Sequence, residues 1–129
     1  MGRNLGAGFA GVVIAGLLVW VVEMIGHSIF PVPEGPDFSD IEALPIGALL
    51  AVVVAWIVGA IGGTFAACRI ATAPPYIYAI LVGGFILLGI GFMLSIIPHP
   101  TWMAVTGVVG TIVGAWLGMF LAGKKAPAE

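Results

Sequence analysis

The 129-residue sequence is too apolar to fold as a soluble globular protein. Hydrophobic residues make up 61% of it, charged residues make up 8%, and the mean hydropathy is +1.22. This composition leaves too little polar surface for water and is typical of an integral membrane protein. Four Lys and Arg residues in total exclude nucleic-acid binding. No phosphate-binding loop, CxxC pair or nucleophile triad is present, so enzyme activity is not indicated.

Four apolar segments are each long enough to cross a bilayer, since about 20 helical residues span a hydrocarbon core of roughly 30 Å. Proline-rich stretches separate them, where the missing amide donor of proline does least harm. We predict an all-α membrane protein whose single domain, residues 1–129, contains four transmembrane helices. In chain order, the helices are expected at about 5–30, 46–70, 76–97 and 101–121.

The first segment carries a polar pair inside its apolar run. Glu23 lies roughly 12 Å before the end of the segment at Pro31, counted at about 1.5 Å per residue, and is the only acid in any predicted span. A carboxylate there costs about 2.5 to 3.5 kcal/mol, so it must face protein or water, be paired or be protonated. His27 follows one turn later on the same helix face and is its candidate hydrogen-bond partner. An intramembrane acid is by default a functional hypothesis.

The loop that follows, at about 31–45, is acidic and contains no Lys or Arg. Its "SDIE" stretch has the form of a capping box, with Ser39 as the N-cap, so we expect a short helical turn there. A loop of this charge is a candidate contact surface for a partner protein. Its carboxylates belong to Glu34, Asp37, Asp40 and Glu42.

Small residues recur every four positions in the second and fourth segments. This spacing lets helix backbones approach closely, which matters in lipid because helices have little hydrophobic drive to associate there. Packing inside one bundle is the favoured interpretation, and a homodimer seam is the alternative. The residues are Ala55, Gly59, Gly63 and Ala67 in the second segment, and Gly110, Gly114, Gly118 and Ala122 in the fourth.

The third loop contributes the second histidine of the chain, His99. Together with Glu23 and His27, it completes the set of the two histidines and the one intramembrane acid, all expected in the outer half of the membrane. Two His and one carboxylate form a recognised ligand set for Zn²⁺ or non-haem iron. However, His99 lies between two prolines and the spacing matches no metal motif. A metal ion is therefore the minority hypothesis for a cofactor.

The second half of the chain repeats the first. "IVGAIGGTFAACRIA", 57–71, aligns without gaps on "IVGAWLGMFLAGKKA", 112–126, and "SIFPVP", 28–33, matches "SIIPHP", 95–100. The ordered Gly, Phe and Pro positions are hard to obtain from biased composition alone. We predict two tandem helical hairpins related by an axis along the membrane normal, the parallel type of repeat.

The repeat provides an internal control for the polar pair. Where the first hairpin has Glu23 and His27, the second has Ile90 and Leu94. The hairpin fold therefore does not require either polar side chain. The acidic loop is also confined to the first hairpin, so the polar features gather in one copy and on one membrane face.

The cations predict the orientation of the chain. In a protein with four crossings, the N-terminus, the second loop and the C-terminus share one side of the membrane. The positive-inside rule places that side in the cytoplasm, so we expect both termini inside, in an inner or plasma membrane. The Lys and Arg residues are Arg3, Arg69, Lys124 and Lys125.

Two functions of different class fit these observations. The favoured one is a structural or accessory membrane subunit, packed through its small-residue faces, whose partners are the bilayer and a second copy or another membrane subunit. The alternative is a small proton- or ion-coupled transporter in which Glu23 exchanges a proton or cation and His27 tunes it. Replacing Glu23 with Gln discriminates between them, because only a transporter loses an ion-dependent phenotype at normal abundance.

Overall fold

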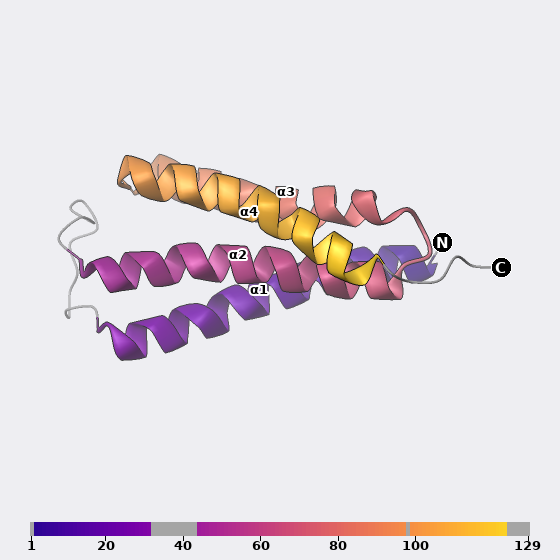
Figure 1. The fold of residues 1–129 in the computed structure, drawn as a ribbon, viewed down its shortest axis with the longest axis horizontal. Helices are drawn as coiled ribbons and strands as arrows, with labels where there is room; N and C mark the ends of the chain where they lie inside the picture. The colour runs from indigo at the N-terminus through magenta and orange to yellow at the C-terminus, as the bar shows by residue number, and fades with distance from the viewer. Residues whose placement is uncertain (1, 32–43, 98, 124–129) are drawn as a thin grey trace.

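The computed structural model describes residues 2–31, 44–97 and 99–123, and the regular structure in these ranges is entirely helical. Each of its four helices is long and apolar enough to cross a membrane (Figure 1). This confirms the prediction of four long apolar helices and fits a small integral membrane protein. The helices are α1 (Gly2–Ile29), α2 (Ile46–Ile70), α3 (Pro75–Ile96) and α4 (Thr101–Ala122).

Three of the helices begin directly after a proline. Pro45, Pro74 and Pro100 cap α2, α3 and α4 with φ of −55°, −55° and −57°. The proline ring fixes φ near this value, and a residue before a helix needs no amide donor. The Pro45 carbonyl accepts the first turn of α2, from the amide of Ala48 at 3.0 Å. This local chemistry explains why α2 occupies the range expected from the sequence.

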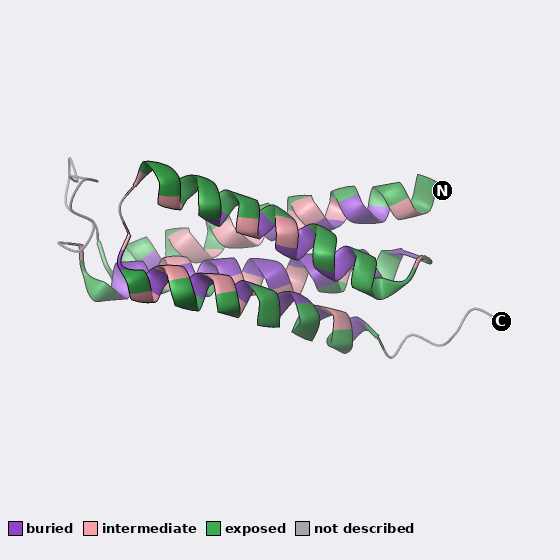
Figure 2. Cartoon of the chain, turned by 90° about the horizontal axis from the view of Figure 1, so that it is seen from above, coloured by how far each residue is buried: buried purple, intermediate pink, exposed green. Residues whose placement is uncertain are grey.

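Helix α2 forms the centre of the bundle. It lies between α1 and α4, and α3 packs beside α4 (Figure 1). Half of the apolar span of α2 is buried, against 22% for α1 and 28% for α3 and for α4. The exposed residues cover the outward faces of the helices (Figure 2). An apolar exterior of this kind is suited to lipid.

Helices α1 and α2 touch through their backbones. A Cβ atom added to Gly63 would lie 2.6 Å from the carbonyl oxygen of Gly11, and one added to Gly59 would lie 2.9 Å from that of Ala15. Only glycine leaves room for such an approach. The small-residue face of α2 is therefore occupied by α1 of the same chain.

The corresponding face of α4 packs against another side of α2. A Cβ atom on Gly114 would lie 3.0 Å from the carbonyl oxygen of Ile57, and one on Gly118 would clash with the Ile61 backbone. Of the eight small residues predicted for helix packing, seven are buried and Gly110 is partly buried, facing the Ile57 side chain. Both faces thus make contacts inside one chain.

Hydrogen bonds close the end of the bundle that contains Gly2 and Ala122, which we call the terminal end. The Asn4 side-chain oxygen accepts the backbone N–H groups of Thr72 at 2.8 Å and of Ala73 at 3.1 Å. The Tyr78 hydroxyl donates to the Asn4 carbonyl oxygen at 3.3 Å, and Arg3 Nε donates to the Ile70 carbonyl oxygen at 2.6 Å. These bonds tie the start of α1 to the turn between α2 and α3.

Two sequence predictions fall outside the described residues. They are the capping box at Ser39, with the four carboxylates of the first loop, and the C-terminal cations Lys124 and Lys125. The hairpin repeat and the orientation of the termini stay predictions as well. In the described part of the chain, α1 lies close along α2, whereas α3 makes a less extensive contact with α4.

Candidate functional site

A cavity of ≈ 910 Å³ opens between α1 and α3 at the opposite end of the bundle, where α1 ends and α2 begins, which we call the first-loop end. Helices α1 and α3 approach each other near the terminal end and diverge toward the first-loop end (Figure 1). Residues of α2 and α4 also line the cavity. Pockets of this size that are mostly apolar, with a few polar groups, are typical ligand sites.

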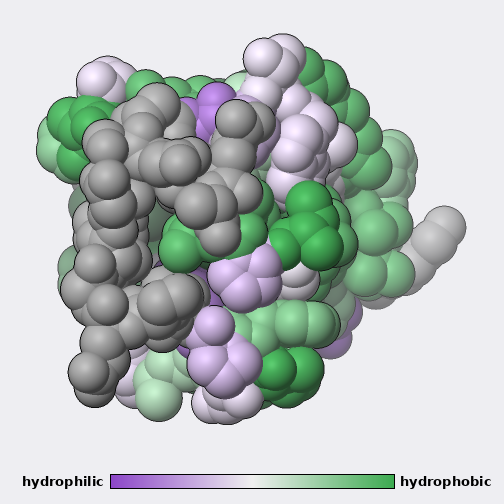
Figure 3. All heavy atoms as spheres, turned by 90° about the vertical axis from the view of Figure 1, so that its left-hand side faces the viewer, coloured by the Kyte–Doolittle hydropathy of each residue, from purple (hydrophilic) through white to green (hydrophobic). Residues whose placement is uncertain are grey.

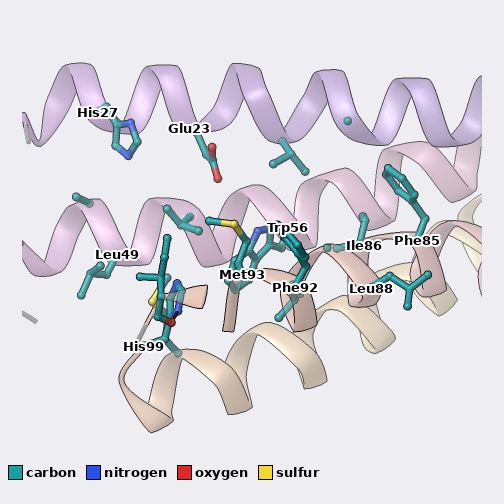
Figure 4. A pocket seen from close by; sticks show the side chains of 18 of the residues that line it. Glu23, His27, Leu49, Trp56, Phe85, Ile86, Leu88, Phe92, Met93 and His99 are labelled. Atoms are coloured by element: carbon teal, nitrogen blue, oxygen red, sulfur yellow. Dashed lines mark hydrogen bonds between the residues drawn. The ribbon is translucent and has the colours of Figure 1, made fainter. Parts of the chain in front are cut away.

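The three polar residues singled out from the sequence, Glu23, His27 and His99, all line this cavity. Glu23 and His27 extend from α1 toward the other helices, and His99 lies across from them near the start of α4 (Figure 4). The rest of the lining is mainly aliphatic and aromatic. We call this space, bounded by these three residues and by Trp56 and Ile90, the Glu23 cavity.

Glu23 is partly buried and His27 is exposed. Within the described residues, no hydrogen bond joins the two side chains, although the sequence suggested one. Both side chains extend from the same helix face into the cavity instead of toward each other (Figure 4). Glu23 is also the only acid among the described residues. Its carboxyl group is therefore available to a ligand or an ion that enters the cavity.

His99 is held by the backbone beside it. Its Nδ1 lies 2.7 Å from the carbonyl oxygen of Ile97. A carbonyl oxygen only accepts, so the bond requires the tautomer with the proton on Nδ1, which leaves Nε2 as the acceptor nitrogen. This bond fixes the orientation of the ring at the wall of the cavity.

The three polar residues line one cavity without converging on one point. Among the residues that the structure describes, no group of three or more His, Cys, Asp or Glu side chains is arranged to hold a metal ion. The metal hypothesis from the sequence therefore finds no ligand set in this part of the chain. Residues can line the same cavity while their side chains are as far apart as a ligand is long. A metal site instead needs donor atoms of all its ligands at about 2.0 to 2.2 Å from one ion.

The apolar walls of the cavity were not predicted. Trp56 carries out two roles, since its ring packs against Gly107 of α4 and also lines the cavity. Phe85 and Met93 of α3 also line the cavity, and Met93 lies across from Glu23 (Figure 4). Nothing in the sequence pairs these residues with Glu23, because the order of helices around the bundle decides which faces meet.

The surface at the first-loop end is mixed. Viewed along the bundle from this end, apolar residues surround a few hydrophilic ones that the grey segment leaves in view (Figure 3). The chemistry of the site follows from this arrangement. A molecule with an apolar body finds matching walls, and a positive group on it finds the Glu23 carboxyl.

No protein-family model matches the sequence, and comparison with curated proteins and with solved structures finds no similar protein.

Proposed function

We propose that this protein is a small membrane transporter that exchanges a proton for a cation at Glu23, inside a cavity that opens to the outer side of the membrane. The observation that carries the proposal is the apolar cavity of ≈ 910 Å³ lined by Glu23, His27 and His99. A lone acid at such a place is costly for the membrane-embedded protein, and such residues mark ion and substrate paths.

The exchange follows from the charge of one carboxyl group. An ionised Glu23 between apolar walls requires a positive partner, whereas a protonated Glu23 does not. A monovalent cation that binds the carboxylate therefore replaces one proton, and the charge of the site is conserved. His27 lines the same cavity, where its imidazole would tune the exchange.

The orientation belongs to the same proposal. With the positive-inside rule, Arg3 and Arg69 at the terminal end put both termini in the cytoplasm of an inner or plasma membrane, and the Glu23 cavity then faces outward. The proposed hairpin repeat is consistent with a specialised first copy. The counterpart of Glu23 in the second copy, Ile90, is 1% exposed, as expected of a packing residue.

Replacing Glu23 with Gln tests the proposal, because the amide keeps the shape of the side chain and cannot ionise. In proteoliposomes that contain a pH-sensitive dye, an added cation is expected to drive proton movement with the wild-type protein and not with Glu23→Gln. The control is Glu23→Asp, which keeps the carboxyl group. Unchanged proton movement with Glu23→Gln, at normal protein abundance, would contradict the proposal.

A structural or accessory subunit is the second candidate function. It is favoured by the absence of any acid or histidine in the sequences of α2, α3 and α4, which leaves no ionisable path beyond the cavity. Its partners would be lipid and another membrane subunit or a second copy. If this second function is correct, Glu23→Gln lowers the amount of folded protein or of assembled complex. Neither the wild-type protein nor the variant then moves protons.

A further inference from the structure

Apolar hollows follow the Glu23 cavity along α1 and α3 toward the terminal end. Two further hollows, of ≈ 660 Å³ and ≈ 600 Å³, lie along these helices. The middle hollow shares Phe85 and Leu88 with the Glu23 cavity, and it shares Val12 and Leu81 with the last hollow. Because neighbouring hollows share lining residues, the three lie in a row along the two helices, and we call this row the α1–α3 groove.

Three glycines of the groove touch nothing at the position of a side chain. An added Cβ atom on Gly16, Gly84 or Gly89 would have no heavy atom within 4 Å outside its own helix neighbourhood. Gly63, in contrast, is required by the close approach of α1 and α2. Glycine inside a helix is less favourable than alanine by roughly 0.5 to 1 kcal/mol. At these three positions its effect is to widen the groove.

The chemistry of the groove is polarised along its length. The middle hollow is lined only by apolar residues and Gly84, and the last hollow adds Asn4 and Tyr78 at the terminal end. The one acid, Glu23, lies toward the first-loop end with His27 and His99. No Lys or Arg is among the residues that line the three hollows. A head group that carries a phosphate therefore meets no strong counter-charge. A purely cationic head meets a carboxyl group.

We propose that the α1–α3 groove holds the apolar tail of a long-chain amine or quaternary ammonium compound while its positive head binds at Glu23. The inference rests on the proposed exchange at Glu23 for the head, and on the row of three apolar hollows and its three glycines for the tail. It names the class of cargo as a single-tailed cationic amphiphile that enters from the lipid.

The tail and the head are tested separately, with dodecyltrimethylammonium and tetramethylammonium as probes. Binding is measured by calorimetry on the full-length protein in phosphatidylcholine nanodiscs, with empty nanodiscs subtracted. Relative to its free concentration in water, the dodecyl compound is expected to bind the wild-type protein at least about tenfold more tightly, because a few methylene groups removed from water account for that ratio.

Gly84→Leu fills the groove and is expected to weaken binding of the dodecyl compound about tenfold while leaving proton release by tetramethylammonium unchanged. The matched control is Gly91→Leu on the same helix. Gly91 also has no atom within 4 Å of an added Cβ, and it lines none of the three hollows. Equal affinities of Gly84→Leu and Gly91→Leu for the dodecyl compound, or no preference of the wild-type protein for the dodecyl tail, would overturn the proposal that the groove holds the tail. Neither result would affect the proposed exchange at Glu23.

Three other results would also overturn the proposal. If Glu23→Gln keeps the full preference for dodecyltrimethylammonium over dodecanol, the head does not bind at Glu23. Proton release by tetramethylammonium that the wild-type protein shows and Glu23→Gln lacks would then show that the exchange itself still stands. If phosphatidylethanolamine in the nanodisc competes with the dodecyl compound, the occupant is a phospholipid. If Gly84→Leu changes the number of chains per nanodisc and not the affinity, the groove is a seam between copies.

Discussion

The two ends of the bundle use their polar residues in different ways. At the terminal end, the Asn4 side chain and carbonyl oxygen hold Thr72, Ala73 and Tyr78, so hydrogen bonds fasten the start of α1 to the rest of the bundle. At the first-loop end, the Glu23 carboxyl makes no hydrogen bond with any residue that the structure describes. It faces a cavity between diverging helices.

This difference separates a polar residue that stabilises the fold from one that is available for function. A polar group inside a membrane protein is costly unless its hydrogen bonds are made. The Asn4 side chain makes its hydrogen bonds within the chain, so removing it should lower the stability of the fold. The Glu23 carboxyl makes none with the described residues, so removing it should affect the binding of a ligand. Transport would further require the helices to separate at the terminal end, and the Asn4 bonds oppose that motion.

The largest expected effect comes from placing a side chain between the backbones of α1 and α2 in the terminal half. Gly63→Leu places a side chain where the Gly11 carbonyl oxygen lies 2.6 Å from an ideal Cβ. Backbone cannot move aside as a side chain can, so the variant should lower the free energy of unfolding by about 3 kcal/mol or more. Unfolding of the purified protein by SDS in mixed micelles measures this loss.

Gly89→Leu in the open half is the matched control. An added Cβ on Gly89 meets no atom within 4 Å, and leucine favours a helix over glycine by roughly 0.5 to 1 kcal/mol. Its stability should therefore equal or exceed that of the wild-type protein. An equal loss in both variants would show that the two halves are packed alike and would remove the basis of the comparison.

Removing the Asn4 side chain should have the next largest effect. Asn4→Ala removes the acceptor of two backbone hydrogen bonds, from Thr72 and from Ala73, and each such bond has a net contribution of about 0.5 to 1.5 kcal/mol. The expected result is a lower unfolding midpoint and faster hydrogen exchange at Thr72 and Ala73. Asn4→Asp keeps an acceptor oxygen and should retain most of the stability. Unchanged exchange at these two amides in Asn4→Ala would mean that the terminal end is held by other contacts.

The helices were predictable because their limits depend on local chemistry. Pro45 and Pro100 begin α2 and α4 through their own fixed φ and carbonyl groups, and the apolar runs between prolines are long enough to cross a bilayer. The role of Asn4 was missed, although a signal exists. It is the only side-chain amide in the sequence, which contains no Gln, and such a group in an apolar chain needs partners.

The walls of the site could not be predicted, because they depend on how the helices are ordered. Glu23 stands out in the sequence as a lone acid, but its cavity is completed by α3. Gly83 and Gly84 show the difficulty. They are adjacent and chemically identical, yet an added Cβ on Gly83 lies 3.1 Å from Ala115, whereas one on Gly84 meets nothing within 4 Å. Only the position of the neighbouring helix distinguishes a packing glycine from one that widens a groove.

His99→Ala is expected to have a smaller effect than Asn4→Ala. It removes the hydrogen bond from Nδ1 to the Ile97 carbonyl oxygen at 2.7 Å, for which the net contribution is about 0.5 to 1.5 kcal/mol. His99→Asn retains a donor on the short side chain and should recover part of that stability. If both variants unfold like the wild-type protein, His99 belongs with Glu23 as a residue available for binding.

Glu23→Gln should have a smaller effect on stability than Gly63→Leu, Asn4→Ala or His99→Ala. The Glu23 carboxyl has no hydrogen bond to lose in the described residues, and the amide has nearly the same volume, so the free energy of unfolding should change by less than about 0.5 kcal/mol. The same unfolding measurement in SDS gives this value beside that of Asn4→Ala. A loss as large as that of Asn4→Ala would mean that Glu23 holds the first-loop end as Asn4 holds the terminal end. The two ends would then be alike, and the structural subunit would become the better account of the protein.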